Sequence, residues 1–155
     1  MTEVKIIVDY AIDEETNEII IPLTTDNAKD ISEAEELYFL IEMEKTVDTT
    51  SAGTVTFGIH NSSGYYVINL LNNASNVSPT SVYNNRASFM CCKNHASDNL
   101  YFCFKSYPNG QYNSKNEFYT LINAISGTEK DGILSCRSTT STAFGVGTRI
   151  RLAIR

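Results

Sequence analysis

The chain has 155 residues, of which 42% are hydrophobic, and its formal net charge is −6 at pH 7. This length fits one domain with enough apolar residues for a core, and the negative charge argues against non-specific binding of nucleic acid. We also expect neither membrane insertion nor export, because no cationic-then-apolar leader and no apolar run near roughly 18 residues is present.

The charge is unevenly distributed along the chain. Residues 1–48 contain 14 acidic residues and three lysines, so they carry −11, whereas the four acidic and nine basic residues of 49–155 give +5. This asymmetry allows three interpretations: the acidic third packs against the basic remainder, copies of the chain meet acidic face to basic face, or the two surfaces are solvated independently.

The first 23 residues predict two strands. Residues 3–12 alternate in polarity with the period of two that is typical of a strand, and residues 17–23 return after a polar turn and end near Pro22. We therefore predict an N-terminal β-hairpin over residues 1–23. It either forms an attachment arm outside the main domain or completes the sandwich of the same chain. As an arm, it would offer a partner an apolar face made of Val4, Ile6, Val8, Ile19 and Ile21.

The main domain is predicted to span residues 24–155 and to be almost entirely β. Residues 24–36 are the one helix-compatible stretch, where we expect at most one short turn of helix with Asp30 or Ser32 as its cap. About ten strands at roughly ten-residue spacing indicate an antiparallel β-sandwich or barrel. The strands predicted after the helical stretch are residues 37–46, 53–60, 65–71, 87–93, 99–106, 117–125, 132–138 and 148–155.

The last strand has the clearest pattern. Ile150, Leu152 and Ile154 alternate with arginines and one alanine, which predicts one buried face. Phe144, Gly145 and Gly147 form an aromatic-anchored turn that precedes it.

The sequence offers few candidates for chemistry. Cys91 and Cys92 would point to opposite faces of a strand, and we expect all four cysteines, with Cys103 and Cys136, to be reduced thiols. His95 near Cys92 lacks the paired ligand spacing of a zinc site, so we expect no metal and no cofactor.

Catalytic residues are not expected either. No Ser/His/Asp spacing, phosphate loop or HExxH motif occurs, and acidic residues are sparse after residue 48. Tyrosines in predicted turns are better candidates, because aromatic rings among Asn, Gln and Ser bind sugars and proteins, although ordinary packing at the rim is the simpler explanation. These candidate ligand-binding residues are Tyr65, Tyr66, Tyr107 and Tyr112.

The segment Phe144–Ile154 resembles the final strand of small jelly-roll domains in phage virion proteins, including tail fibres, head fibres and capsid decorations. The segments 124–127 and 132–137 are similar to the preceding strand of those domains, and Leu37–Glu44 is similar to their opening core strand. The resemblance covers residues 37–155.

This resemblance implies a jelly-roll-like β-sandwich in a non-enzymatic structural protein on the virion surface, assembled in the host cytoplasm. Its implied partners are other virion proteins of the capsid or tail, further copies of itself, and host surface glycans. A carbohydrate-binding module or lectin is the alternative, and a hydrolase without a visible motif is a third hypothesis.

Overall fold

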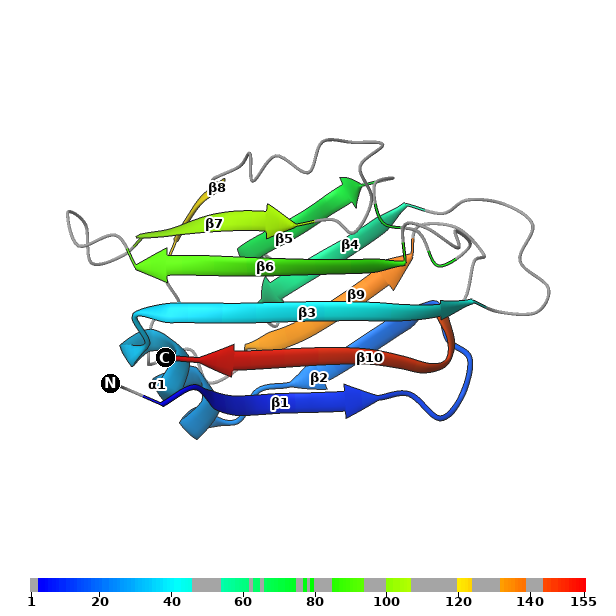
Figure 1. Ribbon diagram of the computed structural model, residues 1–155, viewed down its shortest axis with the longest axis horizontal. Helices are drawn as coiled ribbons and strands as arrows, with labels where there is room; N and C mark the ends of the chain where they lie inside the picture. The colour runs from blue at the N-terminus through cyan, green and yellow to red at the C-terminus, as the bar shows by residue number, and fades with distance from the viewer. Residues whose placement is uncertain are drawn as a thin grey trace.

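The computed structural model describes residues 3–45, 54–61, 63–64, 66–74, 77, 79, 85–93, 100–106, 120–123, 132–138 and 144–155. Within them, two antiparallel sheets pack face to face, and one helix lies near the end where both termini are found (Figure 1). The all-β sandwich expected from the sequence is therefore confirmed. The elements are β1 (Lys5–Ala11), β2 (Glu18–Pro22), α1 (Thr25–Glu33), β3 (Glu36–Lys45), β4 (Val55–His60), β5 (Tyr66–Ala74), β6 (Arg86–Lys93), β7 (Leu100–Ser106), β8 (Thr120–Asn123), β9 (Ile133–Ser138) and β10 (Phe144–Ile154).

The strands pair in a nested order. The six-stranded sheet, here sheet A, has the order β1-β10-β3-β6-β7-β8, and the four-stranded sheet B has the order β2-β9-β4-β5. The first strand thus pairs with the last, β2 with β9, β3 with β6, and β4 with β5. The pairings of β10 with β3 and of β9 with β4 join these ribbons into the two sheets.

The N-terminal strands do not form the predicted hairpin. β1 pairs with β10 in sheet A and β2 pairs with β9 in sheet B, so the two strands lie in different sheets. Both complete the sandwich of the same chain, which was the second alternative considered for residues 1–23.

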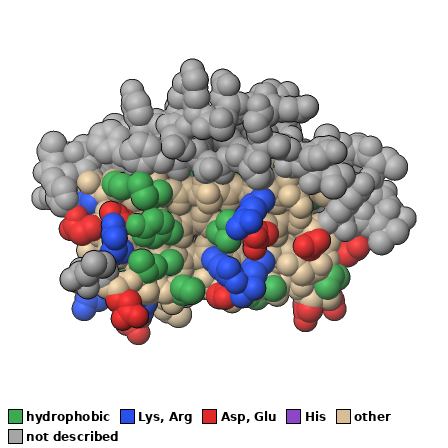
Figure 2. All heavy atoms as spheres, viewed as in Figure 1, with side chains coloured by type: hydrophobic (Ala, Val, Ile, Leu, Met, Phe, Trp, Pro, Cys, Tyr) green, Lys and Arg blue, Asp and Glu red, His purple; other side chains and the backbone are tan. Residues whose placement is uncertain are grey.

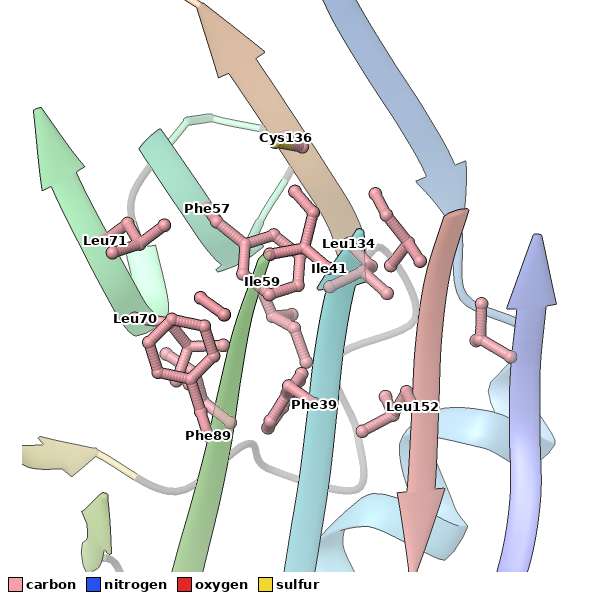
Figure 3. Close-up of a cluster of buried hydrophobic side chains, with 14 of the residues drawn as sticks. Phe39, Ile41, Phe57, Ile59, Leu70, Leu71, Phe89, Leu134, Cys136 and Leu152 are labelled. Carbon is pink, nitrogen blue, oxygen red and sulfur yellow. The ribbon is translucent and has the colours of Figure 1, made fainter. Parts of the chain in front are cut away.

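The core lies between the inner faces of the two sheets (Figure 3). The ring of Phe57 in sheet B packs edge-on against Phe39 of sheet A, with 6.2 Å between the ring centroids, and at a tilt against Phe89 at 5.9 Å. Such aromatic pairs add about 0.5–1.5 kcal/mol to the free energy gained from burial alone. The predicted buried face of the strand at 148–155 is confirmed, because Ile150, Leu152 and Ile154 are buried. In β4 of sheet B, the buried side chains include Val55, Phe57 and Ile59.

The predicted apolar face of residues 1–23 is wrong in part. The register of β1 against β10 shifts between Ile6 and Val8, which is a β-bulge. This shift breaks the alternation on which the prediction rested, so Val8 is buried while Ile6 is exposed. In β2, Ile19 is buried and Ile21 packs against the core. Val8, Ile19 and Ile21 therefore stabilise this domain and do not form an open attachment face.

The helix is longer than predicted and begins elsewhere. α1 has nine residues and is capped by Thr24, whose Oγ1 accepts a hydrogen bond from Asn27 N at 3.0 Å, while Asn27 Oδ1 accepts one from Thr24 N at 3.2 Å. This is a capping box with Asn in place of the usual Glu or Gln. Ala28 and Ile31 bury against the sandwich, and this packing supports a helix that local propensity did not predict. Within the described ranges, no helix is long and apolar enough to cross a membrane.

Candidate functional site

The outer face of sheet A carries an ion-pair network that begins at Asp9. The register places Asp9 beside Arg151 and Ala11 beside Arg149. Arg149 donates from Nε and Nη2 to the two carboxylate oxygens of Asp9, both at 2.7 Å, and Arg151 Nε donates to Asp9 Oδ1 at 3.3 Å. The bidentate geometry links edge strand β1 to β10. Figure 2 shows acidic and basic side chains gathered together on this face.

The two guanidinium groups control the ionisation of Asp9. Hydrogen bonding from Arg149, helped by Arg151, lowers the pKa of the Asp9 carboxyl to about 2, and the same contact raises the pKa of Arg149. A carboxyl with this pKa stays ionised near neutral pH and is unsuited to donate a proton. Asp9 therefore acts as a structural anion that holds β1 on the sheet.

A second cluster ties the end of the described chain to β3. Arg155 Nη2 donates to Glu36 Oε1 at 2.6 Å, and the Tyr38 hydroxyl donates to Glu36 Oε2. The hydrogen bond from Arg155, followed by that from Tyr38, lowers the pKa of Glu36, and the bond to Glu36 raises the pKa of Tyr38. The backbones of Glu36 and Arg155 also exchange two hydrogen bonds of 2.9 Å.

Several ion pairs join the acidic first third of the sequence to its basic remainder. Arg86 also contacts Glu42 at 3.2 Å, and Arg137 approaches Glu18 at 4.0 Å. In each of these pairs the acid comes from residues 1–48 and the base from the remainder, as the first of the three interpretations of the charge distribution predicted.

A bulge at the start of β10 forms a small pocket on the same face. The register against β3 shifts between Gly145 and Arg149, and Gly147 adopts a positive φ of 91°. The buried Thr148 fixes this bulge, because its Oγ1 accepts from Glu44 N at 2.9 Å and donates to Gly145 O at 2.8 Å. The pocket has a volume of about 420 Å³ and is lined by Glu42, Met43, Glu44, Asn85, Arg86, Gly147 and Arg149.

The aromatic residue and glycines that open β10 were predicted as a turn. The structure instead incorporates them into the strand, with Phe144 fully buried. The charges that line the pocket include the Arg86–Glu42 ion pair and the carboxylate of Glu44, so the pocket is a polar recess.

Exposed apolar side chains form the second candidate feature, here called the β1/β2 edge. β1 and β2 are each the outermost strand of their sheet and are joined by a short turn, so they form one side of the sandwich (Figure 1). The exposed fractions there are 51% for Val4, 60% for Ile6 and 54% for Ile20, with Tyr10 also exposed.

The β1/β2 edge agrees only partly with the predicted attachment face. Val4 and Ile6 are accessible, so an attachment role for them stays a prediction. Ile20 was missed, although the alternation of a strand places it on the face opposite its neighbours Ile19 and Ile21. Val146, in the β10 bulge, is also exposed and was not predicted.

The candidate ligand-binding tyrosines stay a prediction. Tyr65, Tyr107 and Tyr112 lie outside the described residues, as does His95. Tyr66 begins β5, but its side chain is also outside the described part of the structure. In the described ranges, no group of three or more His, Cys, Asp or Glu side chains could hold a metal ion.

The expectation of four reduced cysteines is wrong. Cys91 is disulfide-bonded, whereas Cys92 and Cys136 are free. Cys91 is buried and the neighbouring Cys92 is half-buried, beside Glu36 in the register of β3 and β6. Burial raises the pKa of both free thiols, most strongly for the fully buried Cys136. Sequence reasoning missed the disulfide because it depends on which strand lies beside β6.

The comparison with known proteins identified no relative of this chain. No protein-family model, curated protein or solved structure matches the chain. The fold and the site thus define an all-β antiparallel sandwich with an ion-paired outer face and an apolar edge.

Proposed function

We propose that this chain is a non-enzymatic structural protein of a phage particle. In this proposal it is displayed on the particle surface as a capsid decoration, head fibre or tail appendage. The observation that carries the proposal is the nested strand order, which supports a jelly roll. A jelly roll is an eight-stranded sandwich of two Greek keys and is frequent in viral capsid and lectin domains.

The correspondence involves eight of the ten strands. The nested pairs β1–β10, β2–β9, β3–β6 and β4–β5 occupy the order β1-β10-β3-β6 in one sheet and β2-β9-β4-β5 in the other. β7 and β8 extend sheet A beyond β6 and lie outside the eight-stranded pattern. Since a fold hosts many functions, the assignment to a virion also depends on the resemblance of residues 37–155 and on the surface.

The surface supports attachment to a neighbouring subunit of the particle through the β1/β2 edge. Edge strands carry unpaired backbone groups, and natural proteins usually cover them or protect them with charges. Here one acid on each edge strand is already paired, because Asp9 is bound by arginines and Glu18 approaches Arg137. A partner that covers Ile6 on the outer face of sheet A, or Ile20 on the outer face of sheet B, would therefore bury apolar surface without leaving these acids unpaired.

Incorporation into particles tests this function. We expect Ile6→Lys and Ile20→Lys to fold normally, because exposed substitutions change stability by about 0.5 kcal/mol or less, yet to be depleted from particles by about tenfold or more. Ser88→Lys is the matched control, because it adds the same charge at an exposed position of the interior strand β6. Incorporation of the two edge variants at the wild-type level contradicts attachment through this edge.

Binding of a host glycan is the second candidate function, since lectins share the jelly-roll architecture. A glycan array with the purified protein separates the two roles. Specific binding that disappears in Tyr66→Ala or Tyr107→Ala supports a lectin, whereas a protein that enters particles and binds no glycan supports a purely structural role.

A further inference from the structure

The bonded cysteine has one partner compatible with the strand register. β6 and β7 are antiparallel neighbours, and Cys91 stands directly opposite Cys103. Directly opposed residues have Cβ atoms about 4.5–5.5 Å apart, close to the separation that a disulfide requires. The other two cysteines of the chain, Cys92 and Cys136, are free. We propose that Cys91 and Cys103 form a cross-strand disulfide, a modification site that links β7 to β6 when the chain meets an oxidising small-molecule disulfide.

The position of this bond in the sheet gives it a structural consequence. Sheet A ends in the order β3-β6-β7-β8, so β7 is joined to the rest of the sheet through β6, and β8 is joined through β7. Cys91 lies on the buried face of β6. A bond from Cys91 to Cys103 therefore fastens the outer β7–β8 ribbon to the main sheet from inside the sandwich.

The chemistry balances with a disulfide of the oxidised glutathione type. The thiolate of one cysteine attacks the reagent and releases one equivalent of its thiol, leaving a mixed disulfide on the protein. The second cysteine then attacks the protein sulfur and releases the second equivalent. Two protein thiols are thus oxidised to one disulfide, and two electrons and two protons end on the two reagent thiols.

The other cysteines are poor competitors for this reaction. Cys92 belongs to the opposite face of β6, and its thiol is less readily ionised because of burial and the neighbouring Glu36. Cys136 is fully buried in β9 of the other sheet. Selective bonding of Cys91 with Cys103 therefore follows from their opposed positions on neighbouring strands.

Burial also determines when the bond can form. Cys91 has no exposed surface in the folded chain, so a soluble reagent reaches it only during folding or when β7 separates from β6. A chain that folds in a reducing compartment would keep the two thiols until such an opening. Once formed, the disulfide would react slowly with small thiols unless the protein unfolds.

Peptide mapping of the full chain tests the proposal. The protein is refolded with a mixture of reduced and oxidised glutathione, alkylated in denaturant without reductant, and digested for mass spectrometry. We expect one cross-linked peptide pair that contains Cys91 and Cys103, with Cys92 and Cys136 alkylated. Because Cys91 and Cys92 share one peptide, fragment ions assign the bonded sulfur. Four alkylated cysteines, or a bond through the sulfur of Cys92 or Cys136, would overturn the proposal.

Equilibrium unfolding with and without dithiothreitol measures the effect of the bond. Closing a loop of this length reduces the number of conformations open to the unfolded chain by a factor of roughly one hundred. We therefore expect reductant to raise the unfolding equilibrium constant of the wild type about a hundredfold. Cys103→Ser should show no response to reductant, and the adjacent control Cys92→Ser should keep the full response. A reductant response that persists in Cys103→Ser contradicts the assignment. If Cys103→Ser does not fold, the mapping of the wild type still decides the question.

Discussion

Two adjacent isoleucines in β2 test whether the N-terminal strands are part of the sandwich. Ile19 is 3% exposed and Ile20 is 54% exposed, while their backbones pair alike with Cys136 and Ser135 of β9. Replacing a buried isoleucine with alanine costs about 2–5 kcal/mol, because the transfer free energy is lost and a cavity remains. The same replacement at an exposed position costs about 0.5 kcal/mol or less. Because both variants make the same change in strand propensity, their difference isolates burial.

Urea denaturation of Ile19→Ala and Ile20→Ala gives the two free energies of unfolding. With a slope of about 1–3 kcal/mol per molar urea, Ile19→Ala should lower the midpoint by about 1–2 M, and Ile20→Ala should leave it nearly unchanged. The slope itself should stay constant for both variants. Equal and small effects at the two positions would refute our conclusion that β2 is core, and would support the arm that we first considered for residues 1–23.

Two further predictions concern sheet A. The folded pKa of Asp9, about 2, lies below its ordinary value of 3.8, so Asp9 stabilises the fold above about pH 4 and this contribution disappears toward pH 2. When the free energy of unfolding is measured from pH 6 to pH 2, the values for wild type and Asp9→Asn should converge between pH 4 and pH 2. A constant difference between the two proteins would contradict the ion pair. Gly147→Ala should lower the free energy of unfolding by about 1–2 kcal/mol, because φ at this residue is 91°. Gly147→Asn should lower it less, since asparagine tolerates this conformation. Equal losses of the two variants in thermal unfolding would argue against the bulge geometry.

Much of the strand content could be predicted from local alternation. The strand over 148–155 was recognised because Ile150, Leu152 and Ile154 follow a strict period of two, and this face is buried in the structure. The pattern was misleading in β1, because a bulge between Ile6 and Val8 changes the phase and leaves no signal in the sequence. The local sequence pattern was also insufficient to predict the length and start of α1. The burial of Ala28 and Ile31 stabilises this helix, and local helix propensity does not.

The candidate site depends on long-range pairing and was less predictable. Asp9 and Arg149 are 140 positions apart, and they meet because the first and last strands are neighbours in sheet A. Cys91 and Cys103 are likewise opposed by the pairing of β6 with β7. The sequence indicated an acidic third and a basic remainder, but the partners of individual charges and thiols required the strand order.

The location of the protein in intact phage particles tests the proposed function most directly. Antibodies raised against the folded domain and conjugated to gold can be applied to unopened particles and imaged by electron microscopy. We predict label on the outer surface of wild-type particles and at least tenfold less label on particles that carry Ile6→Lys, with Ser88→Lys labelled like wild type. Particles that lack the protein, or that bind the antibody only after they are opened, would contradict a structural protein displayed on the virion surface.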